Sequence, residues 1–144
     1  MINCQVKLAD GAILPKYETK GAAGADVSAL IDSDIVLLPG TWQLIPTGLF
    51  FQIPEGYEIQ VRPRSGLSLK HGVTVLNSPG TIDSDYRGEL KVILINHSKE
   101  NFIIKNHDRI AQIVFSKVTL ADYTITDTLD NTMRGTGGFG STGK

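Results

Sequence analysis

Turn-forming residues recur at short intervals along this chain, and they limit every regular segment between them to a few residues. Clusters that contain Pro, Gly, Asn or Asp interrupt the apolar runs at residues 38–40, 53–56, 78–80 and 106–108. Proline cannot continue a strand ladder, and glycine and asparagine accept the left-handed conformation that tight turns need. A chain divided in this way is expected to form short strands rather than long helices.

The segments between the turns have the patterns of strands. Apolar and polar side chains alternate over residues 57–62, which predicts a strand with one solvated face, and residues 73–76 are expected to follow suit. Residues 90–95 and 110–115 are nearly continuous apolar runs, which predicts strands covered on both faces. Only residues 65–71 could form a short helix, so the predicted fold class is all-β, a sandwich or jelly-roll-like β-barrel.

The composition indicates one small soluble domain. The length of 144 residues and the hydrophobic share of 41% suit a single core. The formal net charge of −1 provides no global field for nucleic acid or an anionic membrane, so neither is expected as a partner. Cys4 is the single cysteine, which excludes an intrachain disulfide and suits a reducing cytoplasm. The three histidines are scattered without zinc-ligand spacing, and no segment reaches the length of a membrane span.

The residues from Leu129 onward are too rich in Gly, Ser and Thr to build a core. Residues 135–140 and 138–144 match two glycine-rich nucleotide fingerprints, but the chain lacks the βαβ unit and the following helix that those fingerprints require. A disordered terminus is the alternative. We favour phosphate binding because glycines expose backbone N–H groups and because four further recognition groups are spaced among them: Arg134, Phe139, Ser141 and Thr142.

Two other segments place polar groups where a phosphate could bind. Residues 63–68 follow a strand and open the expected helical turn, so the first amides of that turn form an anion site with Arg64 beside them. A capped turn with a solvated arginine fits equally well. Arg109 and Gln112 lie at the start of an apolar strand, where a surface ion pair or an edge position is the simpler interpretation.

The densest polar segment, residues 77–89, lies between two apolar strands and is expected to form an extended hairpin. Asp83 and Asp85 are two residues apart, so in an extended chain they share a face and repel each other unless a cation lies nearby. Arg87 is the candidate for that cation. An acidic turn is the alternative, because Asp, Gly, Pro and Ser are common turn residues.

Five segments, in this order and at these separations, resemble the five signature motifs of the trimeric dUTPase family: residues 23–29, 63–72, 76–89, 108–112 and 134–143. Each motif alone is weak evidence, whereas the complete set is specific. One position departs from the pattern, since the fourth motif usually begins with glycine and here His107 stands in that place. Histidine tolerates the left-handed conformation better than most residues, so the local turn is expected to survive.

The resemblance implies an enzyme that hydrolyses dUTP to dUMP and pyrophosphate, which limits uracil in DNA and supplies dUMP for thymidylate synthesis. It implies that Asn77 and the main chain around Thr81 and Ile82 pair with the edge of uracil. Tyr86 is implied to pack under the deoxyribose, where it excludes a 2′-hydroxyl. Asp83 is implied to be the general base for the attacking water.

The other implied roles concern the metal and the phosphate chain. Asp26 is implied to help hold Mg²⁺ through water, while the substrate phosphates supply the inner oxygens. Arg109, in the same motif as Gln112, is expected to form a structural pair with another residue instead of contacting the substrate. The remaining implied contacts are to the phosphates, the pocket wall or the base, and they involve Arg64, Ser65, Gly66, Lys91, Gln112, Arg134, Phe139, Gly140, Ser141 and Thr142.

The resemblance also implies a jelly roll that assembles as a homotrimer, with each site shared between subunits: the third motif from one chain, the second and fourth from another, and the tail from the third. Residues 1–128 are then the jelly-roll domain, and residues 129–144 are a flexible lid of the same domain. Two other functions fit this fold, a dCTP deaminase that releases ammonia and a catalytically silent nucleotide-binding module. The complete third motif and the tail favour dUTP hydrolysis.

Overall fold

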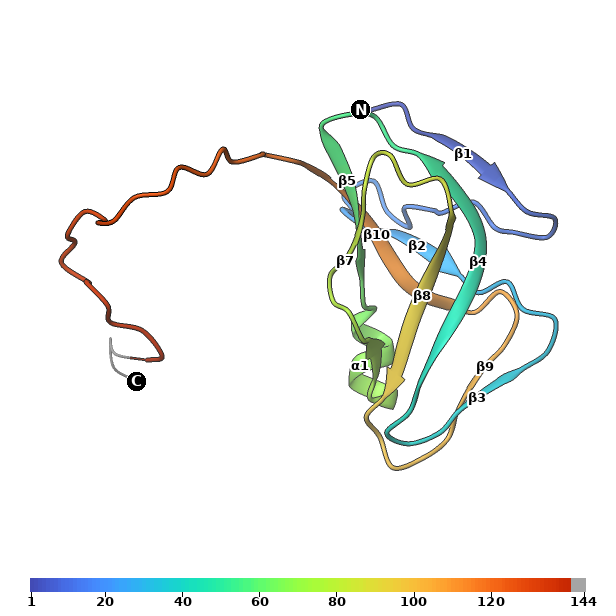
Figure 1. Ribbon diagram of the computed structural model, residues 1–144. Helices are drawn as coiled ribbons and strands as arrows, with labels where there is room; N and C mark the ends of the chain where they lie inside the picture. Colours follow the sequence, from blue (N-terminus) through green and yellow to red (C-terminus); the bar gives the residue numbers. More distant parts are fainter. Residues whose placement is uncertain (141–144) are drawn as a thin grey trace.

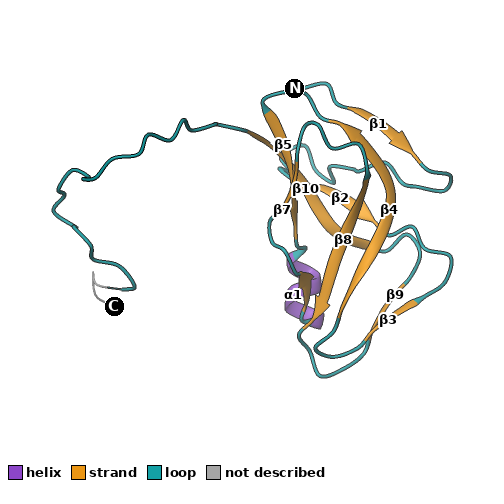
Figure 2. Ribbon diagram, in the orientation of Figure 1, coloured by secondary structure: helices purple, strands orange, loops and turns teal. Residues whose placement is uncertain are grey.

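The computed structural model, which describes residues 1–140, consists mainly of two four-stranded antiparallel sheets whose inner faces share one core (Figure 1, Figure 2). The first sheet has the order β1 (Gln5–Leu8), β4 (Trp42–Gln52), β8 (Glu89–Asn96) and β6 (Val73–Val75). The second has the order β2 (Ala25–Ser28), β10 (Arg109–Lys117), β5 (Tyr57–Arg62) and β7 (Gly80–Ile82). A small sheet pairs β3 (Ile35–Leu37) with β9 (Phe102–Ile104), and α1 (Ser65–His71) follows β5. The prediction of an all-β, jelly-roll-like fold is confirmed.

The strand and the helical turn expected between residues 57 and 71 are both present. In β5, Ile59 and Val61 are buried, whereas Glu58 and Gln60 are half-buried and Arg62 is exposed, as the alternation predicts. The helix α1 ends at Gly72, whose left-handed φ of 63° lets its N–H reach the carbonyl groups of Leu67 and Ser68. Glycine is therefore the residue that allows the chain to turn directly into β6.

Strand β8 is covered along the whole of one face and only in part on the other. Leu90, Val92 and Leu94 are buried in the core, whereas on the opposite face Lys91 is exposed, Ile93 is half-buried and Ile95 is buried. The prediction that this strand is covered on both faces therefore holds at Ile95 and is wrong at Lys91. Apolar content alone did not distinguish a strand between two layers from a strand with a partly open outer face.

The segment between β6 and β8 connects the two large sheets. Val75 lies opposite Leu94, so the two strands pair as the expected hairpin. The connection is not a simple loop, however, because it contains β7, which pairs with β5 in the other sheet through Ile82 opposite Ile59. This crossing fixes the polar residues after β7 at the junction of the sheets.

Strand β4 contains a bulge that is held by Glu89. The register between β4 and β8 shifts between Pro46 and Leu49. Within this bulge Gly48 has a φ of 68°, and an added Cβ would lie 2.5 Å from Leu30 Cδ2, so no side chain fits there. The Glu89 carboxylate oxygen Oε1 accepts hydrogen bonds from the N–H groups of Thr47 at 3.2 Å and Gly48 at 2.9 Å. A charged acceptor thus pairs two amides at the point where the ladder is disrupted.

A buried asparagine joins the large sheets to the small one. The Asn96 side chain is fully buried at the end of β8, and its Nδ2 donates to the carbonyl groups of Leu37 at 2.9 Å and Glu100 at 2.7 Å. Its Oδ1 accepts a hydrogen bond from the N–H of Ser98 at 2.9 Å. Three hydrogen bonds satisfy most of the capacity of the amide, so this polar side chain is compatible with the core.

The chain leaves the folded body after β10. The Val118 N–H donates to the Gly56 carbonyl at 2.9 Å, and from there the backbone runs away from both sheets as far as residue 140 (Figure 1). The side chains of Tyr123 and Ile125 are 91% and 98% exposed. The last strand thus ends at Lys117, and the expected division of the domain at residue 128 stays a prediction. In the described part of the chain, α1 is far too short to cross a membrane.

Candidate functional site

Six of the predicted site residues line one hollow between β7 and the outer face of β4 and β8. The hollow has a volume of about 310 Å³. Its lining includes Asn77, Thr81, Ile82, Asp83, Tyr86 and Lys91. The side chains that the sequence did not identify are Leu44, Glu89 and Ile93. The structure therefore brings the residues of the third motif together with Lys91.

The lining combines apolar walls with polar and charged side chains. Leu44 and Ile93 are opposite each other on β4 and β8, and Ile82 adds a third apolar side chain. Asn77 provides an amide that can both donate and accept hydrogen bonds. A small pocket with apolar walls and polar groups beside them suits one planar ring with a polar edge.

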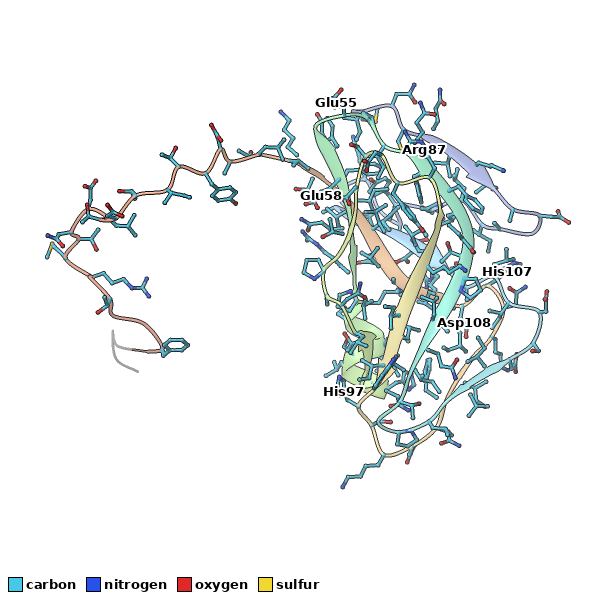
Figure 3. The ribbon with its side chains drawn as sticks, viewed as in Figure 1. Glu55, Glu58, Arg87, His97, His107 and Asp108 are labelled. Atoms are coloured by element: carbon cyan, nitrogen blue, oxygen red, sulfur yellow. The ribbon has the colours of Figure 1, made fainter. Side chains whose placement is uncertain are left out.

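Asp83 lies where this hollow meets a larger groove. Asp83 and Thr81 also line that groove, which has a volume of about 1130 Å³ and carries Glu55, Glu58 and Arg87 on its walls (Figure 3). The Asp83 side chain is exposed, and among the described residues its carboxylate has no hydrogen-bond or ion-pair partner. An exposed, unpaired carboxylate at the mouth of a pocket is available to accept a proton from a water molecule.

The ring of Tyr86 is fixed from two sides. Its hydroxyl donates to the Glu89 carbonyl at 3.1 Å. Gly88 lies so close to the ring that an added Cβ would overlap the hydroxyl and the ring carbon that carries it. Any side chain at residue 88 would therefore displace the tyrosine, so this glycine is needed for the position of the ring that lines the hollow.

The loop after β7 is a turn, not an extended strand. The Tyr86 N–H donates to the Asp83 carbonyl at 3.2 Å, so Asp83 and Asp85 do not share a face in the way an extended chain would place them. Arg87 donates through NH1 to the carbonyl groups of Ser84 at 2.7 Å and Tyr86 at 3.0 Å. The prediction that Arg87 is the cation beside one of the aspartates is wrong, because in the described part of the chain Arg87 forms no ion pair with Asp83 or Asp85 and instead donates to backbone carbonyl groups.

Glu89 is the charged pocket residue that the sequence analysis missed. Besides holding the bulge of β4, its Oε2 lies 3.4 Å from Lys91 Nζ. The carboxylate therefore links the bulge to the pocket wall, and its carbonyl holds Tyr86. The sequence did contain one signal for this role, since Glu89 follows Gly88 and is the first residue of an apolar strand. Its hydrogen-bond partners in β4, however, are more than forty positions away in the sequence.

A second group of predicted residues forms a cluster around Asp26. The Asp26 side chain is only 6% exposed, and Arg109 NH1 lies 2.9 Å from its Oδ2. Its other oxygen, Oδ1, accepts hydrogen bonds from Arg64 Nε at 3.3 Å and Gln112 Nε2 at 3.2 Å. A carboxylate this buried costs several kcal/mol unless it is paired, and these three donors offset that cost. The edge interpretation is wrong, because β10 lies between β2 and β5 and Gln112 donates to a buried carboxylate. The surface ion pair holds in part for Arg109, which is 48% exposed and also lies 3.7 Å from the carboxylate of Glu18.

Ser65 and Gly66 are the first residues of α1 and are exposed. No side chain caps the start of this helix, and its first turn contains no acidic residue. Their amide groups are therefore open to an anion. Within one chain, none of the described residues Arg64, Ser65, Gly66 and Gln112 lines the 310 Å³ hollow, so the structure does not bring the two groups together.

The residues around Asp26 fit a magnesium ion only if water and substrate supply most of the ligands of the ion. No group of three or more His, Cys, Asp or Glu side chains within residues 1–140 is arranged to hold a metal. Asp26 already accepts three hydrogen bonds, which leaves about one acceptor position on Oδ2. That capacity fits a contact through one water molecule and not a protein cage, which agrees with the habit of Mg²⁺ to retain waters and to bind substrate phosphates.

The turn of the fourth motif survives the replacement of glycine by histidine. His107 has a φ of 68°, in the left-handed region, as expected. Its N–H donates to the Ala29 carbonyl at 2.9 Å, and its ring Nε2 lies 3.0 Å from the Gly11 carbonyl oxygen. Figure 3 labels His107 beside Asp108, whose carboxylate accepts a hydrogen bond from the Lys105 N–H at 2.8 Å.

The tail residues lie apart from both groups. Arg134 Nε donates to the Gly137 carbonyl at 2.8 Å, within the tail itself. Phe139 is fully exposed with a φ of 51°, and Gly140 has a φ of 88°. The structure thus leaves these residues away from the hollow of their own chain (Figure 1). Ser141 and Thr142 lie outside the described residues.

Comparison with known sequences gives one consistent family. The dUTPase family model matches residues 10–143. The deoxyuridine 5'-triphosphate nucleotidohydrolase of Treponema denticola is 61% identical over 137 residues, and the match covers 95% of this chain and 95% of the relative. The protein of the same name from Fusobacterium nucleatum is 55% identical over 146 residues, with 100% of both chains covered.

Solved structures agree with this assignment. A mutant of the dUTPase of Staphylococcus bacteriophage 80alpha with dUpNHpp has a TM-score of 0.85 at 26% identity, with 100% of both chains covered. A mutant of the dUTPase from phage phi11 of S. aureus, described with a structural Mg(II) ion, has a TM-score of 0.78 at 24% identity, and the match covers 88% of this chain and 98% of the other. The second likeness concerns the fold alone.

Proposed function

The chain belongs to the dUTPase family and is a dUTP diphosphatase, and we propose that a water molecule activated by Asp83 attacks the α-phosphorus of dUTP. The observation that supports this mechanism most directly is the hollow in which Asp83 stands beside Asn77 and Tyr86. Asp83 takes a proton from the water as the water oxygen bonds to phosphorus. The bond from that phosphorus to the bridging oxygen breaks, and pyrophosphate leaves with the electron pair, so that dUMP remains.

We assign recognition of the nucleoside to the same hollow. The Asn77 amide and the main chain of Thr81 and Ile82 would pair with the edge of uracil, and cytosine would leave these groups unpaired. Buried polar groups without partners can give discrimination of about 10⁴-fold. The Tyr86 ring, held by Glu89 and Gly88, would lie under the deoxyribose and leave no room for a 2′-hydroxyl.

The phosphate chain is assigned to Arg64, Ser65, Gly66 and Gln112, with Lys91 on the pocket wall. Because these four residues do not line the hollow of their own chain, we propose that they serve the hollow of a neighbouring subunit. The tail supports the same proposal, since it leaves its own body and carries Arg134, Phe139 and Gly140 away from it. A homotrimer in which three chains complete each site is the assembly we propose.

Mg²⁺ is the proposed cofactor, and when bound to the substrate phosphates it would neutralise part of the charge that develops on the leaving pyrophosphate. Asp26 would contact it through one water molecule, for which its carboxylate has room. The residues of this chain would orient the phosphates and exclude water around them. We further propose that residues 129–144 close over the bound nucleotide as a lid on the domain formed by residues 1–128, with Ser141 and Thr142 on the phosphates.

The proposed setting is the cytoplasm, which the single cysteine Cys4 suits. There the reaction would limit the incorporation of uracil into DNA and supply dUMP for thymidylate synthesis. Both statements concern the use of the product rather than the chemistry of the site, and they depend on dUTP being the preferred substrate.

The mechanism is tested by measuring pyrophosphate release from dUTP, dCTP, dTTP and UTP, with Mg²⁺ and with EDTA. The wild-type protein is expected to act on dUTP alone and to need the metal. Asp83→Asn preserves the shape of the side chain but removes the base, so kcat is expected to fall at least about a hundredfold with little change in affinity. A near-normal kcat in this variant refutes the role of Asp83, and ammonia release from dCTP would indicate the deaminase instead.

The shared site is tested by co-expression of two inactive chains, one with Asp83→Asn and one with Arg134→Ala. If each site draws these residues from different subunits, some sites in mixed trimers contain both intact groups, and part of the activity returns. Inactive mixed trimers, confirmed by mass spectrometry, would indicate that each site is complete within one chain.

A further inference from the structure

The position of Asp26 suits the orientation of neighbouring side chains better than direct contact with a ligand. Its carboxylate is 6% exposed and lies in the middle of Arg64, Arg109 and Gln112. The backbone of Asp26 is itself fixed, since its N–H donates to the Lys16 carbonyl at 2.9 Å and Gln112 is its cross-strand neighbour in β10. The carboxylate is therefore a rigid anchor on β2.

This anchor leaves donors free on the side chains it holds. Arg64 uses Nε on Asp26, and its NH1 donates to the Arg109 carbonyl at 3.1 Å. A guanidinium carries five N–H donors, so about three remain for an anion. Gln112 donates one amide hydrogen to Asp26 and keeps the other. Both side chains are thus oriented before any nucleotide arrives.

Gln112 is also held from its other side by Gly24. A Cβ added at Gly24 would lie 3.2 Å from the Oε1 and the Cβ of Gln112, which is tighter than ordinary contact. The amide is therefore packed between a glycine backbone and the Asp26 carboxylate. Arg109 completes the arrangement, because its NH1 contacts Asp26 at 2.9 Å while its side chain remains 48% exposed.

We propose that Asp26 and Arg109 are positioning residues that hold Arg64 and Gln112 ready for the triphosphate, and that this effect does not need a metal ion. The inference rests on the proposed function for the assignment of Arg64 and Gln112 to the phosphates. It gives Arg109 a role in binding although Arg109 need not touch the substrate. It also gives Asp26 a role that is independent of any water-bridged contact with Mg²⁺.

The test separates positioning from metal binding by measuring the Kd of the full-length protein for dUpNHpp in EDTA and again in Mg²⁺. Asp26→Asn and Arg109→Gln are expected to weaken binding at least about tenfold in both buffers, because the orientation of Arg64 and Gln112 is lost in both. The Kd for deoxyuridine, which has no phosphate, is expected to stay within about twofold, since the nucleoside hollow is untouched.

Glu18→Gln is the matched control. It removes the other acidic neighbour of Arg109, at 3.7 Å, from an exposed position and is expected to leave the Kd for dUpNHpp unchanged. A loss confined to the Mg²⁺ buffer would mean that Asp26 acts only through the metal, and an unchanged Kd in both variants would mean that the cluster has no part in binding. Either result overturns the proposal.

A failure of the proposed function is distinguishable from these outcomes. In that case the wild-type protein itself would release no pyrophosphate from dUTP and would not bind dUpNHpp. Melting curves of all variants accompany the titrations, and Arg109→Gln is expected to remain folded because Arg64 and Gln112 still donate to the buried carboxylate. A variant that binds deoxyuridine normally is folded around the hollow, so its Kd for dUpNHpp remains informative.

Discussion

Replacing Glu89 by alanine removes the acceptor that holds the bulge of β4. Its Oε1 accepts two backbone hydrogen bonds, from Thr47 at 3.2 Å and Gly48 at 2.9 Å. Bonds to a charged acceptor contribute about 1.5–3 kcal/mol each. The Glu89 side chain is 20% exposed, so water replaces part of this loss, and we expect a destabilisation of about 2–4 kcal/mol.

The ion pair with Lys91 adds little to this figure. Lys91 Nζ lies 3.4 Å from Oε2, and the lysine side chain is 42% exposed, so the pair contributes at most about 1 kcal/mol. For a domain of this size the total corresponds to a fall in Tm of about 6–12 °C. Scanning calorimetry and urea unfolding at one fixed protein concentration measure it, since association shifts the apparent stability.

Two variants serve as controls for this prediction. Glu89→Gln keeps a neutral oxygen for the two amides and is expected to cost about 1–2 kcal/mol, less than the alanine variant. Lys91→Ala removes the ion pair alone and is expected to cost less than about 1 kcal/mol. If Glu89→Ala unfolds within about 0.5 kcal/mol of the wild type, the carboxylate does not hold the bulge, and our account of this pocket wall is wrong.

Three further predictions follow from other parts of the structure. Tyr86→Ala is expected to reduce the ratio of kcat/KM for dUTP to that for UTP by at least about tenfold, whereas an unchanged ratio excludes Tyr86 from sugar selection. Deletion of residues 133–144 is expected to shift Tm by less than about 2 °C and to lower kcat at least about tenfold, because the described part of this segment is exposed and forms no hydrogen bond with the body. A large fall in Tm would instead make the segment structural. His107→Gly is expected to stay within about 1 kcal/mol of the wild type, while His107→Val, which is β-branched at a φ of 68°, costs about 1–3 kcal/mol; equal stabilities would contradict this.

Local patterns in the sequence were sufficient for the elements that depend on neighbouring residues. The alternation over residues 57–62 predicted β5, and the breakers around it predicted the short helix that ends at Gly72. The left-handed turn at His107 was also predictable, since few residue types accept that conformation and histidine is one of them. For β5 and the helix the determining interactions lie within a few residues of one another, whereas the turn at His107 was expected from the glycine that usually stands at that place of the fourth motif.

Elements that depend on distant partners were not predictable. Strand β4 contains Pro46 and Gly48, residues that normally weaken a strand, and it forms because Glu89 pairs the amides of its bulge. Strand β7 is too short for a periodic pattern, and its pairing with β5 rather than β8 is set by the packing of two sheets. No local signal at either segment encodes these contacts.

The candidate site shows the same division. Most residues of the hollow come from one continuous segment, so the third motif located them together. The cluster around Asp26 joins three separate segments, and charge pattern alone could not tell that the half-exposed Arg109 pairs with a buried carboxylate. Glu89 was missed because its role depends on its hydrogen bonds to β4, and the residue type alone does not indicate these bonds.

The chain leaves the folded body after Val118, so residues 119–140 can be treated as a polymer tether that is attached to the body at one end. A coil of roughly 20 residues has a root-mean-square span of about 25 Å. A side chain at its end is therefore present around any site within that radius at an effective concentration on the order of millimolar. Doubling the length of such a tether would cost only about 0.6 kcal/mol, or about threefold in that concentration. The activity of this enzyme should accordingly tolerate insertions between residues 119 and 133 far better than it tolerates the loss of the groups that the tether delivers.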